Sequence, residues 1–399
     1  MIGANRKMSF RVGVMDSVLA GRPSADTFTR VNYLSAVASR VDSYWVPDHI
    51  NGQTPRSLWH PRYTAAARLL QSPDAAMEAW TLLGSLATRR RFNGVRLGIG
   101  VTDTGRRNPA VTAQAIATLH LLTKGRAILG IGPGERVGNE PYGIDWSKPV
   151  ARFEEALATI RALWDSGGKP VTRDWAFFPL RNALFDLPPW KGRWPEIWVA
   201  AHGPRMLRIT GRYGDAWFPG FAHRPQDYAQ RLDIIRSAAS DAGRDPLSIT
   251  PALWLRVVAA SSRGAADEAL DTTIVRAWVM TSAPAQFFAD HGAEHPLGRD
   301  FTGMQDHVVY TMDEETIREK STHVPLSVVK AMLLNGTPED VLEQAAEWRD
   351  HGVRYIVVVN FGPMQPGVRD AMTTVMPFLK VVRQLKRLGP SNGEPHDDR

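Results

Sequence analysis

The feature that most constrains the fold is a regular alternation of short apolar runs, rich in β-branched residues, with longer stretches of helical periodicity. This alternation is typical of parallel βα units, because two parallel strands need a crossover connection that a helix can supply. The predicted strands are eight in number and span residues 10–15, 43–46, 95–101, 127–131, 197–201, 216–219, 249–259 and 355–360. Eight such strands predict an α/β fold, a closed (β/α)8 TIM barrel.

Helical patterns separate the predicted strands. They span residues 109–122, 151–164, 204–213, 225–242, 264–279, 338–351 and 368–388. Several open with proline near the first turn, where the missing N–H has no intrahelical partner to lose. Thr337 to Asp340 is a clear start signal, with a threonine cap, proline at the first position and acids that favour the positive end of the helix dipole.

Two stretches interrupt the alternation. Residues 167–194 carry many aromatic residues and prolines and predict a hairpin-like insertion, whereas residues 282–325 are rich in glycine, proline and histidine without a clear period. Insertions on a barrel usually lie in the βα loops that build the ligand pocket, so we expect both there. We expect one barrel domain over residues 8–387, between a flexible N-terminus (1–7) and a disordered tail (388–399).

Composition excludes several classes of function. The chain has no cysteine, which excludes disulfide scaffolds, thiolate metal sites and cysteine nucleophiles. Lys and Arg exceed Asp and Glu by 48 − 41 = 7, but these charges are dispersed, so we expect no nucleic-acid partner. The arginine excess fits either a general codon preference or a polyanionic ligand. With no signal peptide and no run of about 20 apolar residues, we expect a cytoplasmic protein without a transmembrane segment.

Ionisable residues follow the second predicted strand. Asp48 and His49 come directly after it, and in a barrel the carboxyl ends of the strands face the active site. Histidine is a natural proton donor near neutral pH, so His49 is a catalytic candidate, although a single histidine is more often structural. His291 and His295 have the spacing of a helical metal pair, but Gly292 and Pro296 disfavour a helix and no third ligand is apparent, so we expect no metal.

Glycines mark the ends of other predicted strands. The run 130–135 lacks the final glycine of a dinucleotide fingerprint, because position 135 is Glu. It is either a tight βα turn or a place where the backbone approaches a flat ring or a phosphate. The run 98–103 predicts a bulge or a close ligand approach. At the fifth strand, residues 200–205 leave room for a ligand, and the helix from Pro204 offers backbone donors to a phosphate, although ordinary βα loops look similar.

Together and in this order, these segments resemble the luciferase-like barrel superfamily, and within it the branch that uses the deazaflavin coenzyme F420. The resemblance covers most of residues 8 to 385. It is closer still to the mycobacterial ketoreductases of phthiodiolone and phenolphthiodiolone dimycocerosates. The runs that carry this closer resemblance are residues 42–46, 105–114, 138–143 and 198–206. One departure is Pro47, where the family has a smaller residue.

The resemblance implies roles for individual residues. His49, Glu135 and Asp48 are the implied catalytic candidates, with His49 as proton donor and Glu135 near the ring. A bulge at Ile99–Val101 with a non-prolyl cis peptide would back the ring, and residues 200–204 would hold the phosphate-bearing tail. The implied coenzyme-binding residues are Asp48, Ile99, Gly100, Val101, Thr102, Gly132, Gly134, Glu135, Asn139, Ala200, Ala201, Gly203 and Pro204.

The implied activity is hydride transfer from reduced F420 to the keto group of a long-chain lipid ketone of the phthiodiolone type, which yields a secondary alcohol. The resemblance also implies a homodimer, with transient contact with a membrane surface. We expect an apolar substrate groove at residues 175–194 and 282–325. Two alternatives stay open: a monooxygenase that binds FMN, and a non-catalytic barrel that carries the coenzyme.

Overall fold

The computed structural model describes residues 10–89, 94–220, 224–304 and 308–389. Eight parallel strands close into a barrel, because β11 pairs with β1 at one seam and β8 pairs with β9 at another. The eight are β1 (Arg11–Met15), β2 (Ser43–Val46), β3 (Arg96–Asp103), β4 (Ala127–Gly132), β7 (Glu196–Val199), β8 (Ala216–Trp217), β9 (Thr250–Ala259) and β11 (Tyr355–Asn360). The predicted TIM barrel is confirmed. The sequence did not reveal the short strand β10 (Leu334–Gly336), which pairs with the end of β9.

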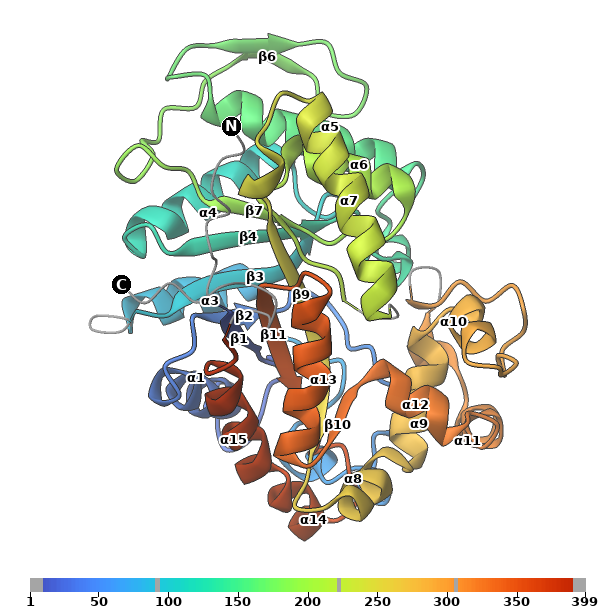
Figure 1. The fold of residues 1–399 in the computed structure, drawn as a ribbon. Coiled ribbons are helices and arrows are strands. Elements are labelled where there is room, and N and C mark those ends of the chain that lie inside the picture. The colour runs from blue at the N-terminus through green and yellow to red at the C-terminus, as the bar shows by residue number, and fades with distance from the viewer. Residues whose placement is uncertain (1–9, 90–93, 221–223, 305–307, 390–399) are drawn as a thin grey trace.

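Helices surround the barrel (Figure 1). The longer ones include α1 (Thr27–Ala38), α3 (Ala79–Thr88), α4 (Pro109–Leu122), α5 (Pro149–Trp164), α6 (Pro204–Tyr213), α7 (Pro225–Asp241), α13 (Pro338–Asp350) and α15 (Val375–Leu385). Shorter ones are α2 (Ala66–Leu69), α8 (Arg263–Leu270), α9 (Thr273–Ser282), α10 (Ala285–Asp290), α11 (Glu314–Ser321), α12 (Leu326–Met332) and α14 (Val368–Thr373). Within the described residues, no helix combines the length and the apolar character needed to cross a membrane.

Two predicted helices are each split in two. The stretch 264–279 forms α8 and α9, because Thr272 has an extended backbone between them. The stretch 368–388 forms α14 and α15, with the break at Thr374. Pro377 lies in the first turn of α15 and has no N–H to donate to the preceding turn, so a new helix begins there.

The aromatic insertion 167–194 is a hairpin, but it lies at the end of the barrel opposite to the expected one. Its antiparallel strands are β5 (Val171–Arg173) and β6 (Leu180–Ala183). Because the hairpin follows α5 and precedes β7, it is an αβ connection near the amino ends of the strands (Figure 1). The Glu155 carboxylate of α5 accepts hydrogen bonds from the backbone of Phe177 and Phe178, which ties the hairpin to that helix. The expectation that this insertion is a βα loop is therefore wrong.

The second insertion is a βα connection, as predicted. Residues 282–325 follow β9 and contain two short helices, α10 and α11, that the sequence did not reveal. Helix α11 has only 8 residues, too few for a clear period, and it begins at a cap where the Asp313 carboxylate accepts a hydrogen bond from the Thr316 N–H. The predicted N-terminus 1–7 and most of the predicted tail, 390–399, lie outside the described residues. The single-domain division stays a prediction.

Aromatic side chains fill the barrel interior. The ring of Trp45 lies 5.0 Å from that of Trp198 and 4.6 Å from that of Phe218, measured between centroids. Gly98 makes room for Trp45, because a Cβ atom at this position would lie 2.4 Å from the Trp45 ring. Tyr355 packs against Trp198 and donates a hydrogen bond to Ser43. We call these four aromatic side chains the aromatic plug. The interior is therefore packed, as is usual for this fold, and a ligand has room only at one end of the strands.

Candidate active site

A cavity of about 1150 Å³ opens at the carboxyl ends of the barrel strands. The βα loops and strand ends of several separate segments line it, as the fold predicts for a ligand site. Of the residues predicted from the sequence, those that line this cavity are Asp48, His49, Gly100, Val101, Gly132, Gly134, Glu135, Ala200, Gly203 and Pro204. Segments far apart in the chain thus meet in one space.

Four predicted coenzyme-binding residues do not line the cavity. Ile99, Thr102, Asn139 and Ala201 are all buried, with at most 1% of each residue exposed. Thr102 donates a 2.6 Å hydrogen bond from its hydroxyl to Asp48. The Asn139 side-chain amide donates a 2.8 Å hydrogen bond to the backbone carbonyl of Glu135. Both polar side chains therefore act behind the cavity wall, where they hold residues that do line it.

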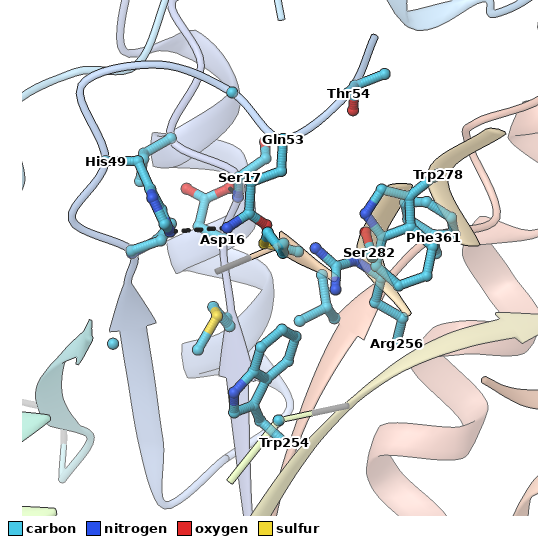
Figure 2. A pocket seen from close by; sticks show the side chains of 18 of the residues that line it. Asp16, Ser17, His49, Gln53, Thr54, Trp254, Arg256, Trp278, Ser282 and Phe361 are labelled. Carbon is cyan, nitrogen blue, oxygen red and sulfur yellow. Dashed lines mark hydrogen bonds between the residues drawn. The ribbon is translucent and has the colours of Figure 1, made fainter. Parts of the chain in front are cut away.

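Gln53 bridges the two principal catalytic candidates. Its side-chain nitrogen lies 3.4 Å from Nε2 of His49 and 3.4 and 3.3 Å from the two carboxylate oxygens of Glu135. The His49 Nδ1 lies 3.9 Å from the nearer of those oxygens. About a quarter of each of the His49 and Glu135 side chains is exposed, so both can reach a ligand in the cavity. Figure 2 shows Gln53 beside His49.

Sequence reasoning missed Gln53. A signal was present, because Gln53 follows His49 by four residues in the same βα loop. An amide at that place has two N–H groups, enough to donate to an imidazole and a carboxylate together.

Asp48 is held from behind by a buried network. Its second carboxylate oxygen lies 3.3 Å from Nη1 of Arg106, whose Nη2 donates a 2.5 Å bond to the Asp48 backbone carbonyl. Arg106 also donates from Nε to Asp103 at 2.6 Å. Burial alone would lower the pKa of Arg106, but the Asp103 and Asp48 carboxylates raise it above its usual value. With Thr102 on its other oxygen, Asp48 positions the loop that carries His49, and these contacts favour positioning over a catalytic role.

The end of β3 has the predicted bulge. The ladder between β3 and β4 shifts its register between Ile99 and Thr102. The peptide bond between Gly100 and Val101 is cis, which confirms the expected non-prolyl cis bond and identifies it. Gly100 has no side chain, and a Cβ atom there would lie 2.9 Å from both Met15 and Trp45. Gly100 and Val101 both line the cavity.

A cationic and aromatic wall faces His49 across the cavity (Figure 2). It is built around Arg256 of β9, whose guanidinium carbon lies 4.1 Å from the ring centroid of Trp278, 5.1 Å from that of Trp254 and 5.4 Å from that of Phe361. Burial lowers the pKa of Arg256 to about 9, and the charge of Glu135 opposes that shift. Arg256 therefore stays cationic at neutral pH. Sequence reasoning missed this wall, because its residues come from three separate elements.

A third region of the cavity offers donors to an anion. Helix α6 begins after Gly203, so the backbone N–H groups of its first turn have no partners within the helix. Arg231 lines the same region and donates a 3.2 Å bond to the backbone carbonyl of His202. Burial, with a smaller effect from Arg231, lowers the pKa of His202 to about 4, so its imidazole is neutral at physiological pH.

The histidine pair of the second insertion has other roles. His291 lies 2.8 Å, through Nδ1, from the backbone carbonyl of Phe287. His295 is buried and lies 3.0 Å, through Nε2, from the backbone carbonyl of Met280. Over the part of the chain that the structure describes, no group of three or more His, Asp or Glu side chains is arranged to hold a metal ion.

The chain is similar in sequence to several known proteins. The chain is 60% identical over 379 residues to the phthiodiolone/phenolphthiodiolone dimycocerosates ketoreductase of Mycobacterium sp. (strain JLS), which covers 95% of this chain and 99% of that protein. It is 27% identical over 353 residues to the 5,10-methylenetetrahydromethanopterin reductase of Methanolobus tindarius, with 88% of this chain and 95% of the relative covered.

Solved structures share the fold. An F420-dependent secondary alcohol dehydrogenase in complex with an F420–acetone adduct matches with a TM-score of 0.69 at 22% identity, over 94% of this chain and 99% of that one. A long-chain alkane monooxygenase matches with a TM-score of 0.64 at 15% identity, over 98% of this chain and 94% of that one. Residues 36–355 match the family described as luciferase-like monooxygenase. The chain therefore belongs to the luciferase-like family.

Proposed function

We propose that the protein is an F420-dependent oxidoreductase that reduces the keto group of a long-chain lipid ketone, of the phthiodiolone or phenolphthiodiolone dimycocerosate type, to a secondary alcohol. The observation that carries the proposal is the meeting of His49, Gln53 and Glu135 with a glycine-rich wall in one cavity. The activities for which the similar ketoreductase, reductase and alcohol dehydrogenase are named support it.

The residues present fit a flat coenzyme with an anionic tail. Gly100 and Gly132 leave the wall without side chains, and a Cβ atom at Gly132 would fill space against Val101 at 3.4 Å. A ring could therefore lie against this backbone, while the start of α6 and Arg231 would hold a phosphate. When bound, the reduced coenzyme supplies the hydride that the ketone carbon accepts.

The protein's own contribution is a proton and its orientation. As hydride reaches the carbonyl carbon, negative charge develops on the carbonyl oxygen, and His49, which lines the cavity, would donate a proton to it. Gln53 and Glu135 hold the imidazole between an amide and a carboxylate, which limits its rotation in the cavity. Asp48 and Arg106 fix the loop that presents it.

An anaerobic titration tests the proposal. The protein is mixed with oxidised or reduced F420, or with FMN, and a long-chain ketone is then added to the reduced complex. We expect tight binding of F420, and one equivalent of alcohol for each equivalent of coenzyme reoxidised.

Two other results would contradict the proposal. Preferential binding of FMN with oxygen consumption would favour a monooxygenase, the activity for which the structurally similar alkane monooxygenase is named. Tight F420 binding without turnover, unaffected by loss of His49 or Glu135, would favour a coenzyme carrier.

Cytoplasmic location, homodimeric assembly and transient membrane contact stay predictions, which fractionation, light scattering and vesicle sedimentation can check.

A further inference from the structure

We propose that a groove between α1 and the pair α14–α15, continuous with the candidate active site, binds one alkyl or acyl chain of the ketone substrate. This inference rests on the proposed function and deepens it, because it assigns a place to the apolar part of the substrate. We call this space the α1–α15 groove. Its main side chains are Phe28 and Val31 of α1, Met372 of α14, and Val375, Phe378 and Leu379 of α15.

The groove and the candidate active site are one cavity. The residues that line it include His49 and Glu135 at the barrel mouth and Val31 and Val375 on the outer helices. The loop after β1, from Asp16 to Leu19, lines the cavity between the two regions. A ketone whose carbonyl lies beside His49 therefore has an open path along this loop for a chain attached to its carbonyl carbon.

The lining that α1, α14 and α15 give to the groove is mostly apolar, and its polar members are Asn32 and Ser35 of α1. Among the residues that α1, α14 and α15 contribute to its lining, all within the described part of the chain, none carries a charge. Two charged residues of these helices engage other partners, since Arg30 pairs with Asp26 and Lys380 pairs with Glu339. The cations that suit a phosphate, by contrast, lie on the side of α6 and β9. The anionic coenzyme tail and the apolar chain would thus bind in different parts of the cavity.

The rim of the groove is open to a chain. Val31 is 55% exposed, Met372 is 61% exposed and Val368 is 47% exposed, while Phe378 at depth is only 5% exposed. When an apolar ligand covers exposed apolar side chains around a recess, its binding is stabilised, because apolar surface is removed from water. The lining helices come from opposite ends of the chain, and a recess between helices suits a narrow chain better than a flat partner surface.

The test is the dependence of reduction on chain length. With reduced F420 and unbranched methyl ketones of increasing length, kcat/KM of the wild-type protein is expected to rise about fourfold for each methylene that enters the groove, and then to level off. The test variant is the double substitution Val31→Glu and Met372→Glu, at two exposed positions where folding tolerates charge. In this variant kcat/KM is expected to rise by less than twofold per methylene. The reduction of the shortest ketone and the binding of F420 are expected to stay unchanged.

A matched control adds the same charges elsewhere. Val111→Glu with Leu122→Glu changes two exposed apolar residues of α4, 46% and 61% exposed, that do not line the cavity. This control is expected to keep the wild-type dependence on chain length. If the groove double variant also keeps it, or if the wild type shows none, the inference is wrong. The same holds if the groove variant alters only the oligomeric state or vesicle binding, since the groove would then serve a second copy or a membrane.

A binding experiment separates failure of the groove from failure of the proposed function. A long-chain ketone with a photoreactive diazirine at its chain end is irradiated with the protein, without turnover, and the adducts are mapped by mass spectrometry. Adducts on α1, α14 or α15 would support the groove even if no ketone were reduced. Adducts confined to other elements would overturn it, whatever the catalytic result.

Discussion

At the scale of single residues, the proposed chemistry depends on one imidazole held between an amide and a carboxylate. His49→Ala removes the proton donor while the coenzyme wall of Gly100 and Gly132 stays intact. We expect single-turnover oxidation of reduced F420 by a ketone to slow by about 10²- to 10⁴-fold, with F420 affinity changed less than twofold. Anaerobic stopped-flow spectroscopy measures the rate, and His323→Ala, at an exposed histidine outside the cavity, is the control. A rate within a few-fold of wild type would assign the proton to another group.

A second residue-scale prediction concerns stability and pH. His202 has a folded-state pKa of about 4, against about 6.5 in the unfolded chain, because burial disfavours its charged form. The neutral form of His202 therefore makes its full contribution to the free energy of unfolding above pH 6.5. That contribution is lost as the pH falls toward 4. We expect the free energy of unfolding to fall by about 1 to 3 kcal/mol between pH 6.5 and 4.5 from this group. In urea titrations His202→Gln should remove that part of the decline, and an unchanged pH slope would argue against a buried neutral imidazole.

At the scale of single elements, the start of α13 illustrates how much a helix cap contributes to the stability of the fold. The Thr337 hydroxyl accepts a hydrogen bond from the Asp340 N–H, and the Asp340 carboxylate accepts one from the Thr337 N–H at 2.9 Å. Arg263 also bonds this carboxylate and, with Thr337, holds the pKa of Asp340 well below its usual range. Thr337→Ala is expected to lower the free energy of unfolding by about 1 kcal/mol. Thr373→Ala on the exposed side of α14 is the control, with an expected change under about 0.5 kcal/mol in the same denaturation assay.

Elements also differ in how well local signals predict them. Helices α4 and α6 begin and end where the sequence predicts, because proline marks each start and the apolar pattern runs to each end. The hairpin of β5 and β6 was predicted as a hairpin but assigned to the wrong end of the barrel. The aromatic content of a segment shows that it packs against something, and gives no information on which end of the strands it covers.

At the scale of the whole molecule, the barrel closes around a packed aromatic plug. Gly98→Ala would place a Cβ atom 2.4 Å from the Trp45 ring, so either the ring or the strand must move. We expect the free energy of unfolding to fall by about 1–3 kcal/mol, measured by thermal and chemical denaturation. The control is Gly264→Ala on α8, where nothing lies within 4 Å of the new atom and alanine favours the helix. Equal stability of Gly98→Ala and wild type would show that the plug is less tightly packed than described.

The sequence by itself determined the eight strands, seven helical stretches, the cap of α13 and the positions of His49 and Glu135 after strand ends. These features are local, since apolar periodicity, proline, caps and strand ends act over a few residues. Only the tertiary structure decided that Gln53 bridges His49 and Glu135, that Arg256 lies against three aromatic rings, and that the α1–α15 groove opens onto the site. The groove depends on barrel closure, which pairs β11 with β1 and so brings the last helix beside the first. No pattern along the chain encodes a neighbour that is more than 300 residues away.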